Sequence, residues 1–149
     1  MLNRPHALLA WFLSKKNQDE KETIFVILDP DFVFLHPLPE DLIEKVSPKH
    51  GVAAYYGLGT QWTAWANQLV PGIYKKPKKP LEIGAPYFLL KQDWIPLLEQ
   101  WIRFAPIVYE SFYSGIESDV YSLMIGALVL LIDFDVPKNL QNTCMRDLR

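Results

Sequence analysis

The chain divides into short apolar blocks separated by polar stretches, and each block has the spacing of a strand or a helix. Residues 24–28 are five large apolar side chains, three of them β-branched, that follow a polar stretch. This pattern is typical of a strand buried on both faces, as in a parallel α/β sheet. Asp29, Pro30 and Asp31 follow directly. Because open α/β sheets bind ligands at the carboxyl ends of their strands, these two acids mark the candidate site.

Helical spacing recurs in other segments. Residues 5–13 and 93–102 each place apolar side chains on one face, and Asp93 suits the N-cap of the second helix. We interpret the apolar stripe of that second helix as core packing without a chemical role. Residues 117–132 begin with acids and continue as an apolar helix, shorter than the roughly 20 residues that cross a bilayer. Residues 61–69 fit either a helix or an ordered loop.

Two further apolar blocks predict strands. Residues 51–56 form a short one, bounded by glycine at both ends. Residues 81–90 form a longer one, which Gly84 and Pro86 interrupt. Glycine and proline inside a strand are typical of a bulge or a bend, so we expect the strand to be irregular at this point.

The order of elements predicts a partial domain. A doubly wound sheet normally starts with strands that hold the nucleotide base, whereas this chain begins with a helix and then a strand. Near the other end the strand-then-acid pattern recurs at Asp133 and Asp135. We therefore expect residues 1–149 to form one α/β domain with a mixed sheet flanked by helices, incomplete at its N-terminus.

Composition narrows the possible partners. The chain has 149 residues, half of them apolar, which is enough for one core. A net charge of −2 argues against a general nucleic-acid binder. The single cysteine, Cys144, excludes an internal disulfide and a cysteine-rich zinc site. Residues 70–80 carry four lysines and three prolines, so they predict a basic loop that either closes over a phosphate-bearing ligand or is simply solvated.

The spacing of Asp29 and Asp31 has a chemical interpretation and a plain one. Two carboxylates with one residue between them supply hard oxygen ligands for Mn²⁺ or Mg²⁺, and such an ion can hold a diphosphate. An Asp-Pro-Asp sequence after a strand also makes an ordinary turn, in which the acids accept hydrogen bonds from backbone amides. Spacing alone does not choose between the two.

Four segments together resemble a known family. They are NRPHALLAWF from residue 3, IFVILDPDFVFLHPL from residue 24, GAPYFLLKQDW from residue 84 and SDVYSLMIGA from residue 118. Their order and spacing are similar to those of the plant and algal peptidyl glycosyltransferases, which comprise hydroxyproline O-arabinosyltransferases and peptidyl serine α-galactosyltransferases. The resemblance extends from Asn3 to about Ala127.

The resemblance implies a fold and an activity. The fold would be GT-A-like, and the donor would be a UDP-sugar bound with Mn²⁺ or Mg²⁺. The sugar, arabinose or galactose, would pass with retention of configuration to the hydroxyl of a hydroxyproline or serine in a protein acceptor. The enzyme would reside in the Golgi or the endoplasmic reticulum, and any membrane anchor would lie outside this chain.

The resemblance also assigns residues to roles. Asp29 and Asp31 match the acids that bind the metal and the donor diphosphate, with Asp31 as the direct metal ligand. Arg4 matches a basic position that would contact the donor. For a downstream metal-binding histidine the chain offers His36 and His50.

Asp119 occupies the position where the family has a glutamate in a Trp-x-x-Glu-Met segment, which makes it the candidate catalytic residue. In this chain Ile116 stands in place of the tryptophan, and Val120 stands in place of the methionine.

Two alternatives remain open. A haloacid-dehalogenase-like phosphohydrolase would use Asp29 as nucleophile and Asp31 as general acid/base, together with a lysine and a late acidic pair such as Asp133 and Asp135. A truncated, non-catalytic transferase-like domain would instead bind a partner through its aromatic side chains.

Overall fold

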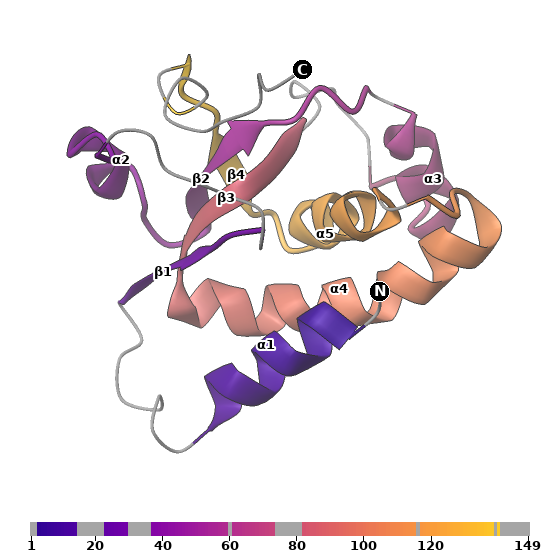
Figure 1. Ribbon diagram of the computed structural model, residues 1–149. Helices are drawn as coiled ribbons and strands as arrows, with labels where there is room; N and C mark the ends of the chain where they lie inside the picture. Colours follow the sequence, from indigo (N-terminus) through magenta and orange to yellow (C-terminus); the bar gives the residue numbers. More distant parts are fainter. Residues whose placement is uncertain are drawn as a thin grey trace.

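The structure is a computed structural model that describes residues 3–14, 23–29, 37–59, 61–73, 82–115, 117–138 and 140. These residues form a mixed α/β arrangement in which helices flank a four-stranded mixed sheet (Figure 1). The helices are α1 (Asn3–Leu13), α2 (Asp41–Glu44), α3 (Trp62–Leu69), α4 (Lys91–Ser111) and α5 (Ser118–Val129). The strands are β1 (Ile24–Ile27), β2 (His50–Tyr55), β3 (Ile83–Leu90) and β4 (Asp133–Asp135).

The strand order is β1-β3-β2-β4. β3 pairs antiparallel with both β1 and β2, whereas β2 and β4 are parallel. The predicted mixed sheet is therefore confirmed at this level. The sequence pattern near the C-terminal end predicted a strand followed by Asp133 and Asp135. In the structure these two residues belong to the strand itself, β4.

The prediction that residues 24–28 form a doubly buried strand of a parallel sheet is wrong. β1 lies at an edge of the described sheet and pairs antiparallel with β3, and Val26 is 39% exposed. On one face of β1, the ring of Phe25 packs edge-on against Trp11 and Phe12 of α1. An apolar run does not reveal how many of its faces are covered, because that depends on partners distant in sequence.

β3 is the strand that is buried on both faces. All of its residues are buried, and they alternate between two apolar clusters. Tyr87 and Leu89 face the main core, and Phe88 faces a smaller cluster with Leu42 of α2 and Val52 of β2. The predicted irregularity is confirmed, since the pairing with β2 jumps from Tyr87 to Gly84 and leaves two residues of β3 as a bulge.

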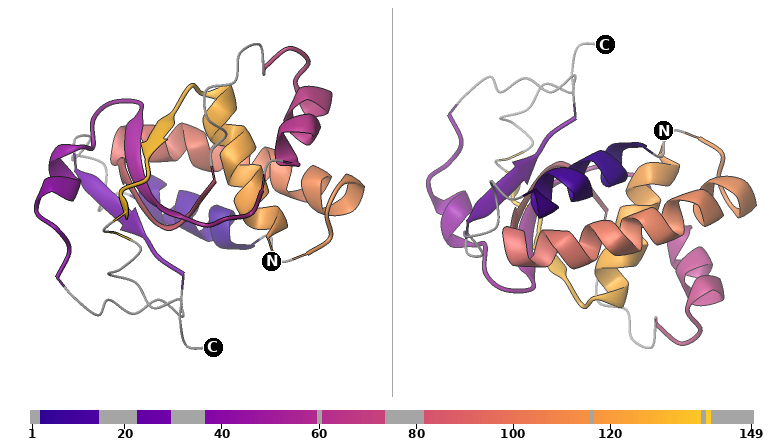
Figure 2. Two further views of the ribbon diagram at one scale, coloured as in Figure 1. Left: turned by 90° about the horizontal axis from the view of Figure 1, so that it is seen from above. Right: turned by 90° about the horizontal axis from the view of Figure 1, so that it is seen from below.

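The helices cover the two faces unequally. α1, α4 and α5 pack together on the main-core face, with α4 in contact with both of the others, whereas α2 lies on the opposite face (Figure 2). Residues 61–69, for which the sequence allowed a helix or an ordered loop, form the helix α3 from Trp62 onward. None of the helices in the described ranges is long and apolar enough to span a membrane.

α4 begins earlier than its sequence predicts. It starts at Lys91, so Asp93 lies in its first turn and is not the N-cap; that position is Leu90, in an extended conformation. The Asp93 carboxylate accepts instead the backbone N–H of Lys49 at 2.9 Å. The predicted stripe is largely confirmed, because Trp94, Leu97, Leu98 and Trp101 are all buried.

Candidate functional site

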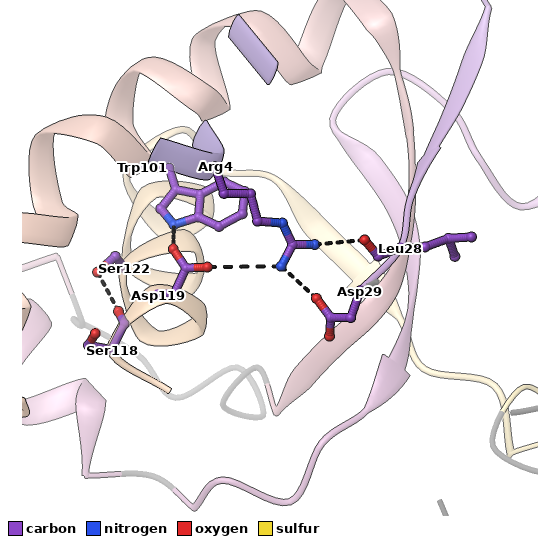
Figure 3. A network of polar contacts seen from close by, with 7 residues as sticks. All are labelled: Arg4, Leu28, Asp29, Trp101, Ser118, Asp119 and Ser122. Atoms are coloured by element: carbon purple, nitrogen blue, oxygen red, sulfur yellow. Dashed lines mark hydrogen bonds and ion pairs between the residues drawn. The ribbon is translucent and has the colours of Figure 1, made fainter. Parts of the chain in front are cut away.

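Three predicted site residues from distant parts of the chain lie together (Figure 3). Arg4 is in the first turn of α1, Asp29 is two residues beyond the end of β1, and Asp119 is in the first turn of α5. The guanidinium of Arg4 lies between the two carboxylates. We call these three residues the Arg4 cluster.

The contacts of Arg4 fix the end of β1. Its Nη1 donates to Oδ1 of Asp29 at 2.5 Å, and its Nη2 donates to the carbonyl oxygen of Leu28 at 3.0 Å. The same Nη1 is 3.9 Å from Oδ2 of Asp119. Because one planar group contacts two acids and a backbone carbonyl, it links α1, β1 and α5.

Trp101 of α4 contacts two residues of the cluster (Figure 3). Its indole N–H donates to Oδ1 of Asp119 at 2.8 Å, and the guanidinium of Arg4 lies 5.7 Å from the centre of its ring. Sequence analysis missed this role, because the tryptophan belongs to a stripe that predicts core packing alone. The signal available in the sequence was chemical: a buried indole N–H usually has a hydrogen-bond partner.

Apolar contacts hold the elements that carry the cluster. Phe12 of α1 is buried against Phe25 of β1, and their ring centres are 5.1 Å apart. Trp94 of α4 donates its indole N–H to the carbonyl of Phe25 at 3.1 Å, which fastens β1 to the helix layer. The cluster therefore lies at one end of a packed α1–β1–α4 unit.

The side chains of the cluster are partly buried, with exposed fractions of 28% for Arg4, 22% for Asp29 and 18% for Asp119. Burial raises the pKa of Asp119 above its usual value, and the negative charge of Asp29 adds to this. Arg4 and the hydrogen bond from Trp101 act in the opposite direction. A carboxyl group whose pKa is shifted toward neutrality, within a group of charged residues, is typical of a proton-transfer site.

Tyr87 of β3 is a second residue that sequence analysis missed. It is 2% exposed and lies opposite Ile27 in the pairing of β1 with β3. Burial raises the pKa of its hydroxyl, with a further contribution from the charge of Asp29. The hydroxyl of Tyr87 is therefore close enough to the Arg4 cluster for the charges of its three residues to act on its pKa.

The remaining predicted site residues lie either outside the described residues or away from the cluster. Asp31, His36 and Ile116 lie outside the described residues, as does most of the lysine-rich segment. His50 of β2 lies beside Asp135 of β4, with Nε2 3.4 Å from Oδ1, on the other side of β3 from β1. Asp133 is in β4 too, so the late acidic pair that a phosphohydrolase would need is at the opposite edge of the sheet from Asp29.

The oxygens of the cluster are of a type that binds hard cations, but here they contact the guanidinium of Arg4. Carboxylate and carbonyl oxygens are the ligands that Mg²⁺ and Mn²⁺ prefer. Asp29, Asp119 and the carbonyl of Leu28 all direct an oxygen at the guanidinium, which itself carries a positive charge. In the ranges that the structure describes, no three His, Cys, Asp or Glu side chains form a group that could hold a metal ion. The side chains that the structure describes therefore do not form a divalent-cation site by themselves.

Protein-family models, curated proteins and solved structures were all compared with the chain, and none of them matches.

Proposed function

We propose that this chain is part of a GT-A-like glycosyltransferase that transfers arabinose or galactose from a UDP-sugar to a hydroxyproline or serine hydroxyl of a protein. One observation carries the proposal. The family resemblance assigns Arg4, Asp29 and Asp119 to the donor and catalytic site, and these residues lie together although they come from three separate elements. The same resemblance supports a location in the Golgi or the endoplasmic reticulum.

Arg4 suits the donor diphosphate. A guanidinium presents several N–H donors in one plane and binds phosphate oxygens in pairs. Arg4 is partly exposed and already contacts oxygen atoms through both terminal nitrogens. It would bind the diphosphate, hold it in one orientation and balance part of its charge.

Asp29 and Asp119 would divide the remaining work. Asp29, with Asp31 two residues later, would supply carboxylate oxygens to Mn²⁺ or Mg²⁺. Such an ion offsets the charge that develops on a leaving diphosphate. Asp119 is held by Trp101 and has a raised pKa, so it is suited to accept a proton from the acceptor hydroxyl.

Nucleotide binding tests the proposal most directly. UDP binding would be measured by calorimetry with and without Mn²⁺ for the wild-type chain, Asp29→Asn and a control, Asp41→Asn. Asp41 is an exposed acid paired with Lys45 at 2.8 Å, so the control removes an equivalent ion pair elsewhere. We expect Asp29→Asn to weaken Mn²⁺-dependent UDP binding by about tenfold or more, because a charged ligand is lost. The control should bind as the wild type does.

Transfer from UDP-arabinose and UDP-galactose to a hydroxyproline- or serine-containing peptide would then be measured with the same proteins. Mn²⁺-dependent transfer supports the enzyme. UDP binding without turnover would favour a non-catalytic transferase-like domain. If UDP does not bind, or binds equally well to Asp29→Asn, the proposed donor site is wrong.

A further inference from the structure

The two oxygens of the Asp119 carboxylate have different surroundings (Figure 3). Oδ1 accepts the indole N–H of Trp101 at 2.8 Å. Oδ2 lies 3.9 Å from Nη1 of Arg4, which is beyond hydrogen-bond distance. Among the residues that the structure describes, Oδ2 therefore has a charged neighbour but no hydrogen bond. It is the oxygen that remains available to take up a proton.

We propose that Trp101 is a positioning residue for Asp119. By holding Oδ1, it fixes the rotation of the carboxylate and turns Oδ2 toward Arg4. In the function proposed above, the proton of the acceptor hydroxyl would pass to Oδ2, and the hydroxyl oxygen would bond to the sugar as UDP leaves. That last step rests on the proposed function, whereas the positioning of Asp119 does not depend on it.

The indole of Trp101 is held in place by its own packing. The residue is 1% exposed and belongs to the buried stripe of α4, so its ring has little room to move. The guanidinium of Arg4 lies 5.7 Å from the centre of the same ring, within the range of a cation–π interaction. One buried ring therefore contacts both Asp119 and Arg4, and it fixes the two charged groups relative to each other.

The close approach of α5 to α4 brings Asp119 within reach of this indole. Gly126 lies on the same side of α5 as Asp119, because the seven residues between them make nearly two turns of the helix. A Cβ at Gly126 would lie 3.0 Å from the Cβ of Gln100 and 3.5 Å from the backbone nitrogen of Trp101. The missing side chain thus lets the two helices approach closely beside the residue that holds Asp119.

The hydrogen bond from Trp101 also affects the protonation of Asp119. Burial raises the pKa of Asp119, Arg4 and the Trp101 hydrogen bond lower it, and the charge of Asp29 raises it. Tyr87 of β3 interacts electrostatically with the same carboxyl group. Removing the indole N–H takes away a contact that favours the ionised form, so Asp119 should then hold its proton more tightly. A tryptophan that only fills space predicts no such change.

Nuclear magnetic resonance of the aspartate carboxyl carbons, without substrate, follows the ionisation of Asp119 as the pH is raised. The proteins are the wild-type chain, Trp101→Phe and the control Trp94→Phe. Trp94 is a buried tryptophan two turns earlier in α4, and its N–H bonds to the carbonyl of Phe25, so the control removes the same group from the same stripe. We expect Asp119 to bind its proton about tenfold more tightly in Trp101→Phe and as in the wild type in Trp94→Phe.

The wild-type chain offers a second test that does not depend on whether a variant folds. The indole N–H resonance of Trp101 should shift with the ionisation of Asp119, because the charge of its hydrogen-bond partner changes, and Asp119→Asn should abolish this shift. The N–H resonance of Trp94 should not follow the same titration, since its partner is a backbone carbonyl. A Trp101 resonance that ignores the ionisation of Asp119, or an unaltered Asp119 titration in folded Trp101→Phe, overturns the proposal.

Transfer of a sugar from UDP-arabinose or UDP-galactose to the acceptor peptide, measured with the same proteins, separates this inference from the proposed function. If the wild type transfers the sugar, Trp101→Phe should lower kcat about tenfold with little change in KM for the UDP-sugar, and should move the acidic limb of the pH profile to higher pH. Tighter proton binding by Asp119 in Trp101→Phe, with no transfer by any of the proteins, would support the positioning and reject the transferase. Transfer by the wild type with the same kcat and pH profile in Trp101→Phe would do the reverse.

Discussion

The centre of the sheet and the end of its edge strand β1 are held in place by different kinds of interaction. β3 is buried along its whole length and packs between two apolar clusters, whereas the Arg4 cluster is held by charged and polar contacts among partly exposed side chains. Burial of apolar area supplies most of the stability of a fold, and exposed ion pairs supply little. We therefore expect the apolar clusters around β3 to contribute more to stability than the Arg4 cluster does.

The largest effect should come from the main apolar cluster, which packs on one face of β3. Trp94 is fully buried, touches the rings of Phe12 and Tyr87, and donates its indole N–H to the carbonyl of Phe25. Trp94→Ala should lower the free energy of unfolding by about 3–5 kcal/mol, because it leaves a cavity and removes the partner of a backbone carbonyl. Urea denaturation followed by circular dichroism measures this.

The matched control is Trp11→Ala, at a tryptophan that is 48% exposed and packs on the same Phe25. Its loss should be about 1 kcal/mol, because a half-exposed ring buries less area. Equal losses for the two variants would show that stability is not concentrated in the centre.

The sequence predicted most elements but not how the strands share the sheet. The apolar blocks of β1 and β3 each predict a strand, and the sequence analysis expected burial on both faces only for β1. What separates them is the number of neighbours: β3 lies between β1 and β2, and β1 lies at an edge of the described sheet. Strand order follows from contacts between distant segments, so no local pattern reveals it.

The start of α4 shows a similar limit. Aspartate before an apolar stripe is a good N-cap signal, yet the Asp93 carboxylate accepts the N–H of Lys49, from the loop before β2. The Asp93 carboxylate could accept a hydrogen bond from its own helix or from a distant segment, and in the structure it bonds to the distant one. The helix then begins at Lys91, directly after the last residue of β3.

The candidate site was predictable by residue but not by arrangement. The family resemblance singles out Arg4, Asp29 and Asp119, whereas their convergence depends on how α1 and α5 pack around α4. Trp101 was hidden because a tryptophan on a helical stripe predicts packing whether or not its N–H has a specific acceptor. Asp31, which the prediction made the direct metal ligand, lies outside the described residues.

A double-mutant cycle on Arg4 and Asp29 should give a much smaller effect than Trp94→Ala. With Arg4→Gln, Asp29→Asn and the double variant, urea denaturation should give a coupling energy of about 0.5–1 kcal/mol, because solvent screens this partly exposed pair. A coupling above about 3 kcal/mol is typical of a buried structural pair. That result would remove the contrast between the two regions.

The smallest effect is a pH dependence at Asp119. Its pKa in the folded protein is raised from a usual value of 3.8, chiefly by burial, so the folded state binds this proton more tightly than the unfolded state does. The stabilisation that results is present below pH 3.8 and is lost as the pH rises through the raised pKa. Asparagine cannot ionise, and its side-chain oxygen can still accept the N–H of Trp101.

The unfolding free energy of Asp119→Asn relative to the wild type should therefore increase as the pH rises from 3.8 toward neutrality, and urea denaturation of both proteins at each pH, without metal, measures the difference. Asp41→Asn should show the opposite slope, since its hydrogen bond to Lys45 lowers the pKa of that exposed acid. If Asp119→Asn instead loses stability relative to the wild type with rising pH, Arg4 outweighs burial at Asp119. The end of β1 would then be held mainly by the ion pairs of Arg4, and burial would contribute less there than it does along β3.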